Sequence, residues 1–324
     1  MNAPSPSQPS LLEHAEQSIS VGSKSFAAAA RLFDPATRRS AVMLYAWCRH
    51  CDDVIDGQVL GFDAQAVPAD EHRRRLGRLY EQTRAAYAGM AMSEPAFAAF
   101  QEVARRHAIP QRDAFDHLEG FAMDVQGQIY QTLDDTLRYC YHVAGVVGLM
   151  MARVMGVHDE ATLDRACDLG IAFQLTNIAR DIVEDAQAGR CYLPRQWLHE
   201  LHIAPEQVAE GANREALAVL SRRLVALAEP YYMSASAGIA RLPLRSAWAV
   251  GTARNVYRQI GVRVDKLGAQ AWDARVSTSK ADKLRLVLQG GISALSARGV
   301  DWPPRDPQLF QRPSGRPDPQ DRGL

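Results

Sequence analysis

The segment Gln174–Asp185, which reads QLTNIARDIVED, determines how the rest of the chain is interpreted. At about 100° per residue, one helical stripe gathers its polar side chains, Gln174, Asn177, Asp181, Glu184 and Asp185. Ile171, Leu175, Ile178, Ile182 and Val183 cover much of the remaining circumference, which predicts a helix buried nearly all round. Carboxylates on a buried seam repel one another and lose hydration unless a cation compensates them. The sequence therefore predicts a cation site on this helix.

A second segment of the same kind is Tyr45–Asp56, which reads YAWCRHCDDVID. Its polar face gathers Tyr45, Arg49, Asp52, Asp53 and Asp56, and its other face is apolar. Both segments contain the spacing D-x-x-x-D, which sets two carboxylates one helical turn apart, and each has an arginine beside it, Arg49 or Arg180. Two such helices facing each other suit Mg²⁺, which takes oxygen ligands and completes its shell with water and substrate phosphates.

Composition limits the class of protein. With 324 residues, 47% of them hydrophobic, the chain can build one large core or two modest ones. Basic and acidic residues balance at 37 each, which argues against a nucleic-acid-binding protein. Five scattered cysteines favour a reducing compartment. Because there is neither a signal-peptide pattern nor an apolar run of about 18 residues, we expect a cytoplasmic protein that lies free or on a membrane surface.

The hydrophobic pattern is helical from residue 11 to about 300, without β alternation, internal repeats or a dividing linker. Residues 1–10 form a Pro/Ser arm expected to be disordered, and residues 301–324 a Pro-rich tail. The sequence therefore predicts a single all-α domain over residues 11–300. Its helices are expected at 11–30 (broken near 21–26), 37–56, 71–88, 95–107, 112–130, 133–156, 161–186, 216–240, 244–267 and 281–297.

Some local patterns leave alternatives open. VGSKSF at Val21–Phe26 predicts either a helix start capped by Ser23 or a break whose hydroxyl and N–H groups bind an anion. In the helix 133–156, the aliphatic stripe is either ordinary core or the wall of an apolar cavity, and the small residues opposite it predict close helix packing. The loop 189–194, GRCYLP, is placed to act as a lid.

Other polar patterns have plainer explanations. Cys48 and Cys51 have the spacing of a redox or metal motif, but they lie on an apolar helix face and are interpreted as structural thiols. A di-iron carboxylate bundle would need E-x-x-H pairs, and the sequence has none. Asp124 is either a buried ion-pair partner or an outer acid of the metal site.

The two acidic segments closely resemble the corresponding motifs of the squalene and phytoene synthase family. The resemblance extends over nearly the whole chain between its ends and includes VGSKSF, EGFAMDV, LRYCYHVAGVVGLMM, FQLTNIARDIVEDAQAGRCYLP and PLRSAWAVGTARNVYRQIG. It implies the isoprenoid synthase type I fold, an all-α bundle around a central cavity. In that family, Mg²⁺ bridges two prenyl diphosphates to the paired aspartate motifs.

The resemblance also implies roles for individual residues. Metal ligands would be Asp52, Asp53 and Asp56 on one helix and Asn177, Asp181 and Asp185 on the other. Diphosphate contacts would come from Ser23, Ser25, Tyr45, Arg49, Arg180 and Arg275. The reaction cavity would be lined by Phe26, Tyr139, Val143, Val147, Gly148 and Gln174, with Tyr192 and Tyr257 completing it. The expected catalytic set is Tyr45, Arg49, Asp52, Asp56, Arg180, Asp181 and Asp185.

The implied reaction is that of the phytoene-forming members. Two geranylgeranyl diphosphates condense head to head through prephytoene diphosphate to phytoene, a step of carotenoid biosynthesis that releases diphosphate. Mg²⁺ is the expected cofactor, with Mn²⁺ as an alternative, and no NADPH is expected because phytoene formation needs no hydride. Because the product is very apolar, peripheral contact with the inner membrane and with other carotenoid-pathway enzymes are hypotheses, while no nucleic acid is expected.

Three rival functions remain at this point. The nearest is a synthase that converts farnesyl diphosphate to dehydrosqualene or squalene, since cavity depth decides between these substrates. A cyclising terpene synthase usually pairs D-D-x-x-D with an N-x-x-x-S-x-x-x-E motif, whereas this chain has acids at both places. An inactive helical scaffold or lipid-binding protein would show no metal dependence.

Overall fold

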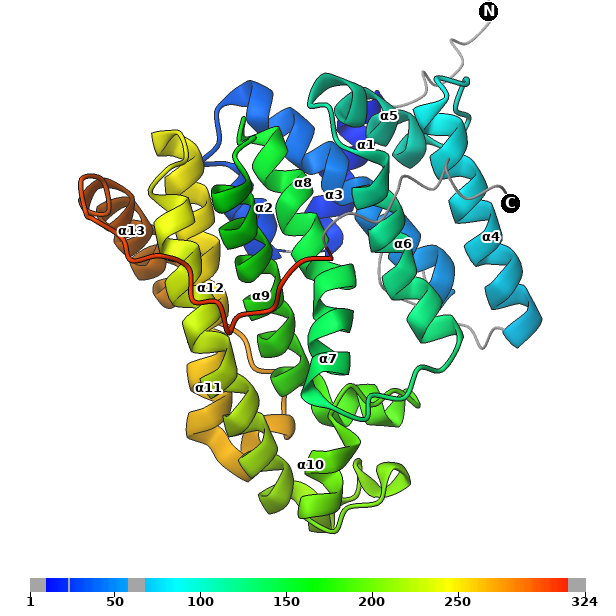
Figure 1. Ribbon diagram of the computed structural model, residues 1–324, viewed down its shortest axis with the longest axis vertical. Helices are drawn as coiled ribbons and strands as arrows, with labels where there is room; N and C mark the ends of the chain where they lie inside the picture. The colour runs from blue at the N-terminus through cyan, green and yellow to red at the C-terminus, as the bar shows by residue number, and fades with distance from the viewer. Residues whose placement is uncertain (1–9, 23, 58–67, 314–324) are drawn as a thin grey trace, which may run out of the picture.

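The computed structural model describes residues 10–22, 24–57 and 68–313, and within these ranges its regular structure is entirely helical (Figure 1). The first helices are α1 (Leu11–Gly22), α2 (Lys24–Ala30), α3 (Pro35–Asp56), α4 (Ala69–Tyr87), α5 (Pro95–Arg106) and α6 (Gln111–Val125). The remaining ones are α7 (Leu133–Cys140), α8 (Val146–Val154), α9 (Glu160–Gln187), α10 (Arg195–Glu200), α11 (Arg214–Ile239), α12 (Leu244–Leu267) and α13 (Lys280–Ser296). The prediction of an all-α fold is confirmed.

Helix α9 is the centre of the bundle, with α7, α8, α11 and α12 packed around it (Figure 1). Its first turn is fixed by Asp159, whose Oδ1 accepts a hydrogen bond of 2.9 Å from the backbone N–H of Thr162. Leu163, Ile171 and Leu175 are fully buried along it. The sequence pattern of this helix, apolar nearly all round, follows from its central position.

The helix expected over 133–156 is interrupted by a π-helical turn at Tyr141–Gly145, which separates α7 from α8. Small residues bring this segment against α9. A Cβ on Gly170 would lie 2.1 Å from the carbonyl oxygen of Ala144, and one on Gly148 would lie 2.3 Å from that of Ala166. The predicted close helix approach is confirmed, because no side chain larger than hydrogen fits at either glycine.

Helix α3 begins and ends at well-defined caps. Asp34 Oδ1 accepts hydrogen bonds of 3.0 Å from the N–H groups of Ala36 and Thr37, and Gly57 ends the helix in the left-handed conformation, with φ 64°. The apolar face of α3 packs against α1 and α5, where Trp47 stacks on Phe100 with ring centroids 4.0 Å apart. This packing buries the apolar face of α3 completely at Trp47.

The C-terminal strap (residues 301–313) crosses α9 and α11 (Figure 1). Arg305 binds both carboxylate oxygens of Asp168 on α9, at 2.7 and 2.8 Å, and Asp168 is completely buried. Arg312 binds Asp164 and Glu160 one and two turns earlier. Although the Pro-rich sequence predicted a tail from 301 onward, these thirteen residues are part of the folded body; the sequence beyond 313 and residues 1–9 lie outside the described ranges.

One helix end and one additional helix differ from the sequence prediction. Helix α6 ends at Val125, earlier than the expected Tyr130, because Gly127 takes the left-handed conformation with φ 64°. The short helix α10, which follows the loop 189–194, was not predicted. No helix in the described part of the chain has the length and apolarity needed to cross a membrane.

Candidate active site

The first acidic motif lies in the last turns of α3, where Arg49 holds two of its carboxylates. Arg49 Nη1 is 2.8 Å from Asp52 Oδ2, and Nη2 is 2.9 Å from Asp53 Oδ1. The side chain of Arg49 is only 19% exposed, so these charge-assisted contacts are partly shielded from water. The helical spacing that grouped Arg49 with the acids in the sequence places them together in space.

The second acidic motif lies in the last turns of α9. Arg180 binds its neighbour Asp181 through two contacts, Nε to Oδ1 at 2.7 Å and Nη2 to Oδ2 at 2.5 Å. One turn earlier, Asn177 Nδ2 donates a hydrogen bond of 3.3 Å to Gln174 Oε1. The Oδ1 atom of Asn177 is buried and has no hydrogen-bond partner. An amide oxygen left in this state has the capacity to accept from, or coordinate, a further group.

The loop after α9 joins the two motifs. Arg190 Nη2 binds Asp56 Oδ1 at the end of α3, and Arg190 Nη1 lies 3.5 Å from Asp56 Oδ2. Tyr192 donates a hydrogen bond of 3.1 Å to Asp124 Oδ1, and Tyr139 donates one of 3.0 Å to Asp124 Oδ2. The rings of Tyr139 and Tyr192 stack with centroids 4.5 Å apart. These contacts connect the ends of α3, α6, α7 and α9, so the acidic motifs meet at one end of the bundle.

Burial and mutual repulsion disturb three carboxyl groups at this end. Burial, reinforced by the neighbouring Asp56, raises the pKa of Asp52 to about 7, against the opposing charge of Arg49. Burial, reinforced by Asp181, raises the pKa of Asp185 to about 7 as well. Burial raises the pKa of Asp124 to about 6. Perturbed acids from three helices at one place are typical of a functional site.

The acids do not form a ready-made metal cage. In residues 10–22, 24–57 and 68–313, no group of three His, Cys, Asp or Glu side chains is close enough to hold a metal ion. Arginines instead compensate Asp52, Asp53, Asp56 and Asp181. The donors nevertheless fit a hard cation, because carboxylates with raised pKa values and the unpartnered oxygen of Asn177 are oxygen ligands that gain from a positive charge.

Tyr45 lies where α1 and α2 meet α3. Phe26 stacks on its ring with centroids 5.4 Å apart, and a Cβ on Gly22 would lie 2.5 Å from its hydroxyl oxygen. Burial raises the pKa of Tyr45 to about 12, so its hydroxyl remains a hydrogen-bond donor near neutral pH. Of the two serines in this segment, Ser23 lies outside the described residues, and Ser25 belongs to α2 with its side chain outside the description.

Half-buried apolar and aromatic side chains lie on α9 and on the helices packed around it. Tyr257 on α12 stacks on Phe173 of α9, with centroids 4.2 Å apart. Val143 and Val147 are half-buried and pack against the core. Gly148, which the resemblance assigned to the cavity wall, also contributes to helix packing, because a Cβ there would lie 2.3 Å from the carbonyl oxygen of Ala166 on α9.

Arg275 approaches from the segment after α12. Its Nη1 lies 3.1 Å from Glu184 and its Nη2 3.8 Å from Asp181, and its side chain is 61% exposed. It therefore reaches the outer edge of the second motif.

Two members of this site were not assigned from the sequence. Arg190 lies in the predicted lid loop, but no periodic pattern connected it to Asp56. Asp124 is open to two interpretations from the sequence, and in the structure it accepts hydrogen bonds from Tyr139 and Tyr192 beside the acidic motifs. A single arginine in a loop belongs to no helical period. Only its positive charge beside an acid-rich segment could therefore have indicated that Arg190 belongs to the site.

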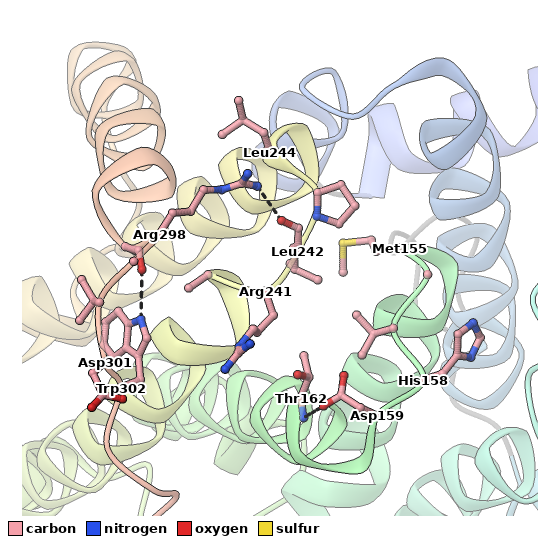
Figure 2. A pocket seen from close by; sticks show the side chains of 17 residues that line it. Met155, His158, Asp159, Thr162, Arg241, Leu242, Leu244, Arg298, Asp301 and Trp302 are labelled. Atoms are coloured by element: carbon pink, nitrogen blue, oxygen red, sulfur yellow. Dashed lines mark hydrogen bonds between the residues drawn. The ribbon is translucent and has the colours of Figure 1, made fainter.

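A surface cavity of about 760 Å³ lies at the other end of α9. Figure 2 shows His158, Asp159 and Thr162 on one side of it and Arg241, Leu242 and Trp302 on the other. From Glu160, where α9 begins, Asp181 is 21 residues away, or about 30 Å along the helix at 1.5 Å per residue. This cavity is therefore separate from the acidic motifs.

Comparisons with known proteins agree with this arrangement. The chain is 63% identical to the 15-cis-phytoene synthase of Pantoea ananas over 94% of its own length and 99% of that protein, and 61% identical to that of Enterobacter agglomerans over 91% and 100%. Among solved structures, a dehydrosqualene synthase superposes with a TM-score of 0.78 at 27% identity, covering 88% of this chain and 97% of the other. The squalene/phytoene synthase family profile matches residues 19–282. The chain belongs to the squalene/phytoene synthase family.

Proposed function

We propose that this protein is a prenyltransferase that condenses two geranylgeranyl diphosphates head to head to 15-cis-phytoene. The reaction passes through prephytoene diphosphate and releases both diphosphate groups. The observation that carries the proposal is the meeting of two acidic motifs at one end of the bundle, each held by its own arginine. The identity of more than 60% to two 15-cis-phytoene synthases supports the choice of substrate.

Loss of diphosphate is the step for which the polar end of the site is suited. As the carbon–oxygen bond breaks, negative charge grows on the departing diphosphate, and fixed donors aimed at it lower the barrier. Arg49, Arg180 and Arg275 supply positive charge there, and the hydroxyl of Tyr45 remains protonated as a donor. On substrate binding, these arginines would exchange part of their carboxylate contacts for phosphate oxygens.

Mg²⁺ is the metal ion that the oxygen ligands at this end of the bundle suit. Asp52, Asp53 and Asp56 on α3, with Asn177, Asp181 and Asp185 on α9, would hold it, and Mn²⁺ is an alternative with the same ligand preference. When bound, the metal would neutralise charge on the diphosphate oxygens. Its positive charge would also oppose the burial and the repulsion that together raise the pKa of Asp52 and Asp185.

The apolar part of the site suits the carbocation that remains. That cation must meet an alkene and must not meet water, which requires a dry wall. Val143, Val147 and the stacked pair Phe173 and Tyr257 provide aliphatic and aromatic surface beyond the acids. The final proton loss needs only a weak base, and the released diphosphate is one.

Turnover by the purified protein tests this function. Incubation with geranylgeranyl diphosphate and Mg²⁺ should give phytoene by product chromatography, whereas EDTA should stop the reaction. Asp52→Asn and Asp185→Asn should each lower turnover by about 10²-fold or more while circular dichroism stays that of a helical protein. Glu81→Gln, at an exposed carboxylate of α4, is the matched control and should be fully active.

Three outcomes would contradict the proposal. Product from farnesyl diphosphate alone would make the chain a dehydrosqualene-type synthase. Product that appears only with NADPH would make it a squalene synthase. Near-normal turnover in Asp52→Asn or Asp185→Asn would remove the metal role from that residue.

A further inference from the structure

The outward face of α13 carries a continuous apolar stripe. Its four members are exposed to an unusual degree for large hydrophobic side chains: Leu284 65%, Leu288 58%, Ile292 67% and Leu295 62%. Their spacings of four, four and three residues keep them within an arc of about 80° on the helix. Single exposed hydrophobic residues are common on soluble proteins, but a contiguous row along one helix marks an interaction surface.

The opposite face of α13 is already used for packing. Leu286 is 3% exposed and Ala294 is completely buried. A Cβ on Gly290 would lie 2.5 Å from Thr252 Oγ1, so α13 lies flush on α12. Figure 1 shows α13 at the edge of the bundle, beside α12. The helix is therefore apolar on two opposite sides, and no packing within residues 10–22, 24–57 and 68–313 explains the stripe.

Charge around the stripe is predominantly positive. The sequence from Lys280 to Arg298 contains four basic residues and one acid, whereas the whole chain has 37 of each sign. The acid, Asp282, is engaged by the N-cap hydroxyl of Ser279 and by Arg263 Nη2 at 2.5 Å. Arg285 follows Leu284 at the margin of the stripe, with its side chain 57% exposed. The surface thus combines exposed aliphatic groups with basic charge.

We propose that α13 is a membrane-docking helix that lies in the surface of an anionic lipid bilayer. A helix with a leucine-rich face bordered by Lys and Arg binds in the plane of the interface: its apolar side chains enter the boundary between headgroups and acyl chains, and its basic residues meet lipid phosphates. Leu284, Leu288, Ile292 and Leu295 supply the first interaction, and Arg285 contributes to the second.

A second copy of this chain is a less favourable occupant. Two copies apposed along this stripe would bring together two segments that each carry four basic residues and a single, already engaged acid. Like charges brought together across an interface oppose association, whereas anionic lipid complements them. The docking surface is also one helix away from the apolar interior, because α12, on which α13 packs, carries Tyr257 against Phe173.

Flotation with vesicles tests the proposal without any substrate, so its outcome is independent of the reaction this chain catalyses. The full chain should float with vesicles of equal parts phosphatidylcholine and phosphatidylglycerol, less with phosphatidylcholine alone, and less at high salt because screening weakens the charge contribution. Leu288→Gln combined with Ile292→Gln should lower binding to the anionic vesicles by about tenfold or more. Arg285→Glu should lower it and reduce its salt dependence.

The matched control is Met233→Gln combined with Val219→Gln on α11. These side chains are 67% and 41% exposed but belong to no contiguous row, so vesicle binding should not change. Circular dichroism and thermal melting check that each variant is folded. Equal flotation of the α13 and α11 variants would overturn the proposal. The proposal would also be overturned if light scattering showed a wild-type dimer and a monomeric α13 variant, and if the wild type did not bind vesicles.

Discussion

The guanidinium of Arg190 joins the loop after α9 to the carboxylate of Asp56, 134 residues away at the end of α3. This contact connects the loop that follows the second acidic motif to the first acidic motif on α3. In the same loop, Tyr192 donates a hydrogen bond to Asp124. A cation in this position compensates a half-buried acid and at the same time holds the loop over the site. The loop's contacts are thus of the kind that a lid makes when it is closed.

Arg190→Ala should therefore lower turnover by about 10²-fold, the usual cost of losing one charged donor at a site of developing negative charge. Arg190→Lys keeps the charge but loses the two-pronged geometry, so it should fall between the wild type and Arg190→Ala. Initial rates measured across a Mg²⁺ titration check this expectation. Full activity of Arg190→Ala would show that the arginine serves only to fix the loop.

The stability of the metal-free protein should depend on pH in a defined direction. The pKa of Asp52 and of Asp185 is about 7 in the folded protein, above the value of about 4 in an unfolded chain, so the folded state binds more protons between these values. The stability that these groups contribute is present below about pH 4 and is lost as pH rises to about 7. In metal-free protein, Asp185→Asn should therefore raise the melting temperature at pH 8 more than at pH 5.

Addition of Mg²⁺ should raise the wild-type melting temperature at pH 8 more than at pH 6, because at the lower pH the cation must displace protons from its ligands. Differential scanning fluorimetry at both pH values gives the comparison. Asp185→Asn should show a much smaller Mg²⁺-induced shift than the wild type. The same shift in both proteins at pH 8 would exclude Asp185 as a ligand.

Glycine at position 170 should be essential for the packing of α9. Alanine usually stabilises a helix relative to glycine, but a Cβ here would lie 2.1 Å from the carbonyl oxygen of Ala144. Gly170→Ala should thus destabilise the protein by about 1–3 kcal/mol, as overpacking does. Gly77→Ala on α4, where a Cβ would meet nothing within 4 Å, should stabilise it by about 0.5–1 kcal/mol. Urea unfolding of both variants measures the difference, and effects of the same sign would contradict this account.

Removing only one member of the ion pair between the C-terminal strap and α9 should greatly lower the free energy of unfolding. Arg305→Ala leaves the completely buried Asp168 without its bidentate partner and should cost about 3–5 kcal/mol in the free energy of unfolding. Arg222→Ala, which removes an exposed pair with Asp265, is the control and should cost less than about 1 kcal/mol. Replacing both members, as Arg305→Met with Asp168→Leu, should recover most of the loss. A cost for Arg305→Ala as small as that for Arg222→Ala would show the strap to be dispensable.

Most of the fold could be predicted from the sequence, because helices with an apolar face leave a period of 3.6 residues. The stripe Gln174–Asp185 indicated a buried helix with a polar seam, and α9 is that helix. The π-helical turn Tyr141–Gly145 was not predictable in this way, since one inserted residue in an apolar run does not interrupt its hydrophobicity.

The site was predictable where its residues share a helix face and unpredictable where they meet across the chain. Arg49 and Asp52 are neighbours on α3 by spacing alone. Arg190 meets Asp56, and Arg305 meets Asp168, only because the helices bring distant segments together. The strap itself has no apolar period: it is held by two arginines and by the backbone N–H of Phe310, which donates to the Tyr231 hydroxyl at 3.1 Å. Contacts between individual groups of this kind cannot be predicted from the composition of the segment.

The separation of Asp168 from Arg305 has a consequence during biosynthesis. The aspartate is translated 137 residues before the arginine that neutralises it, which at about 5–20 residues per second is a delay of roughly 7–27 s. Throughout that interval the nascent α9 carries a carboxylate that is costly to bury, so the bundle can close fully around its central helix only after Arg305 has been synthesised.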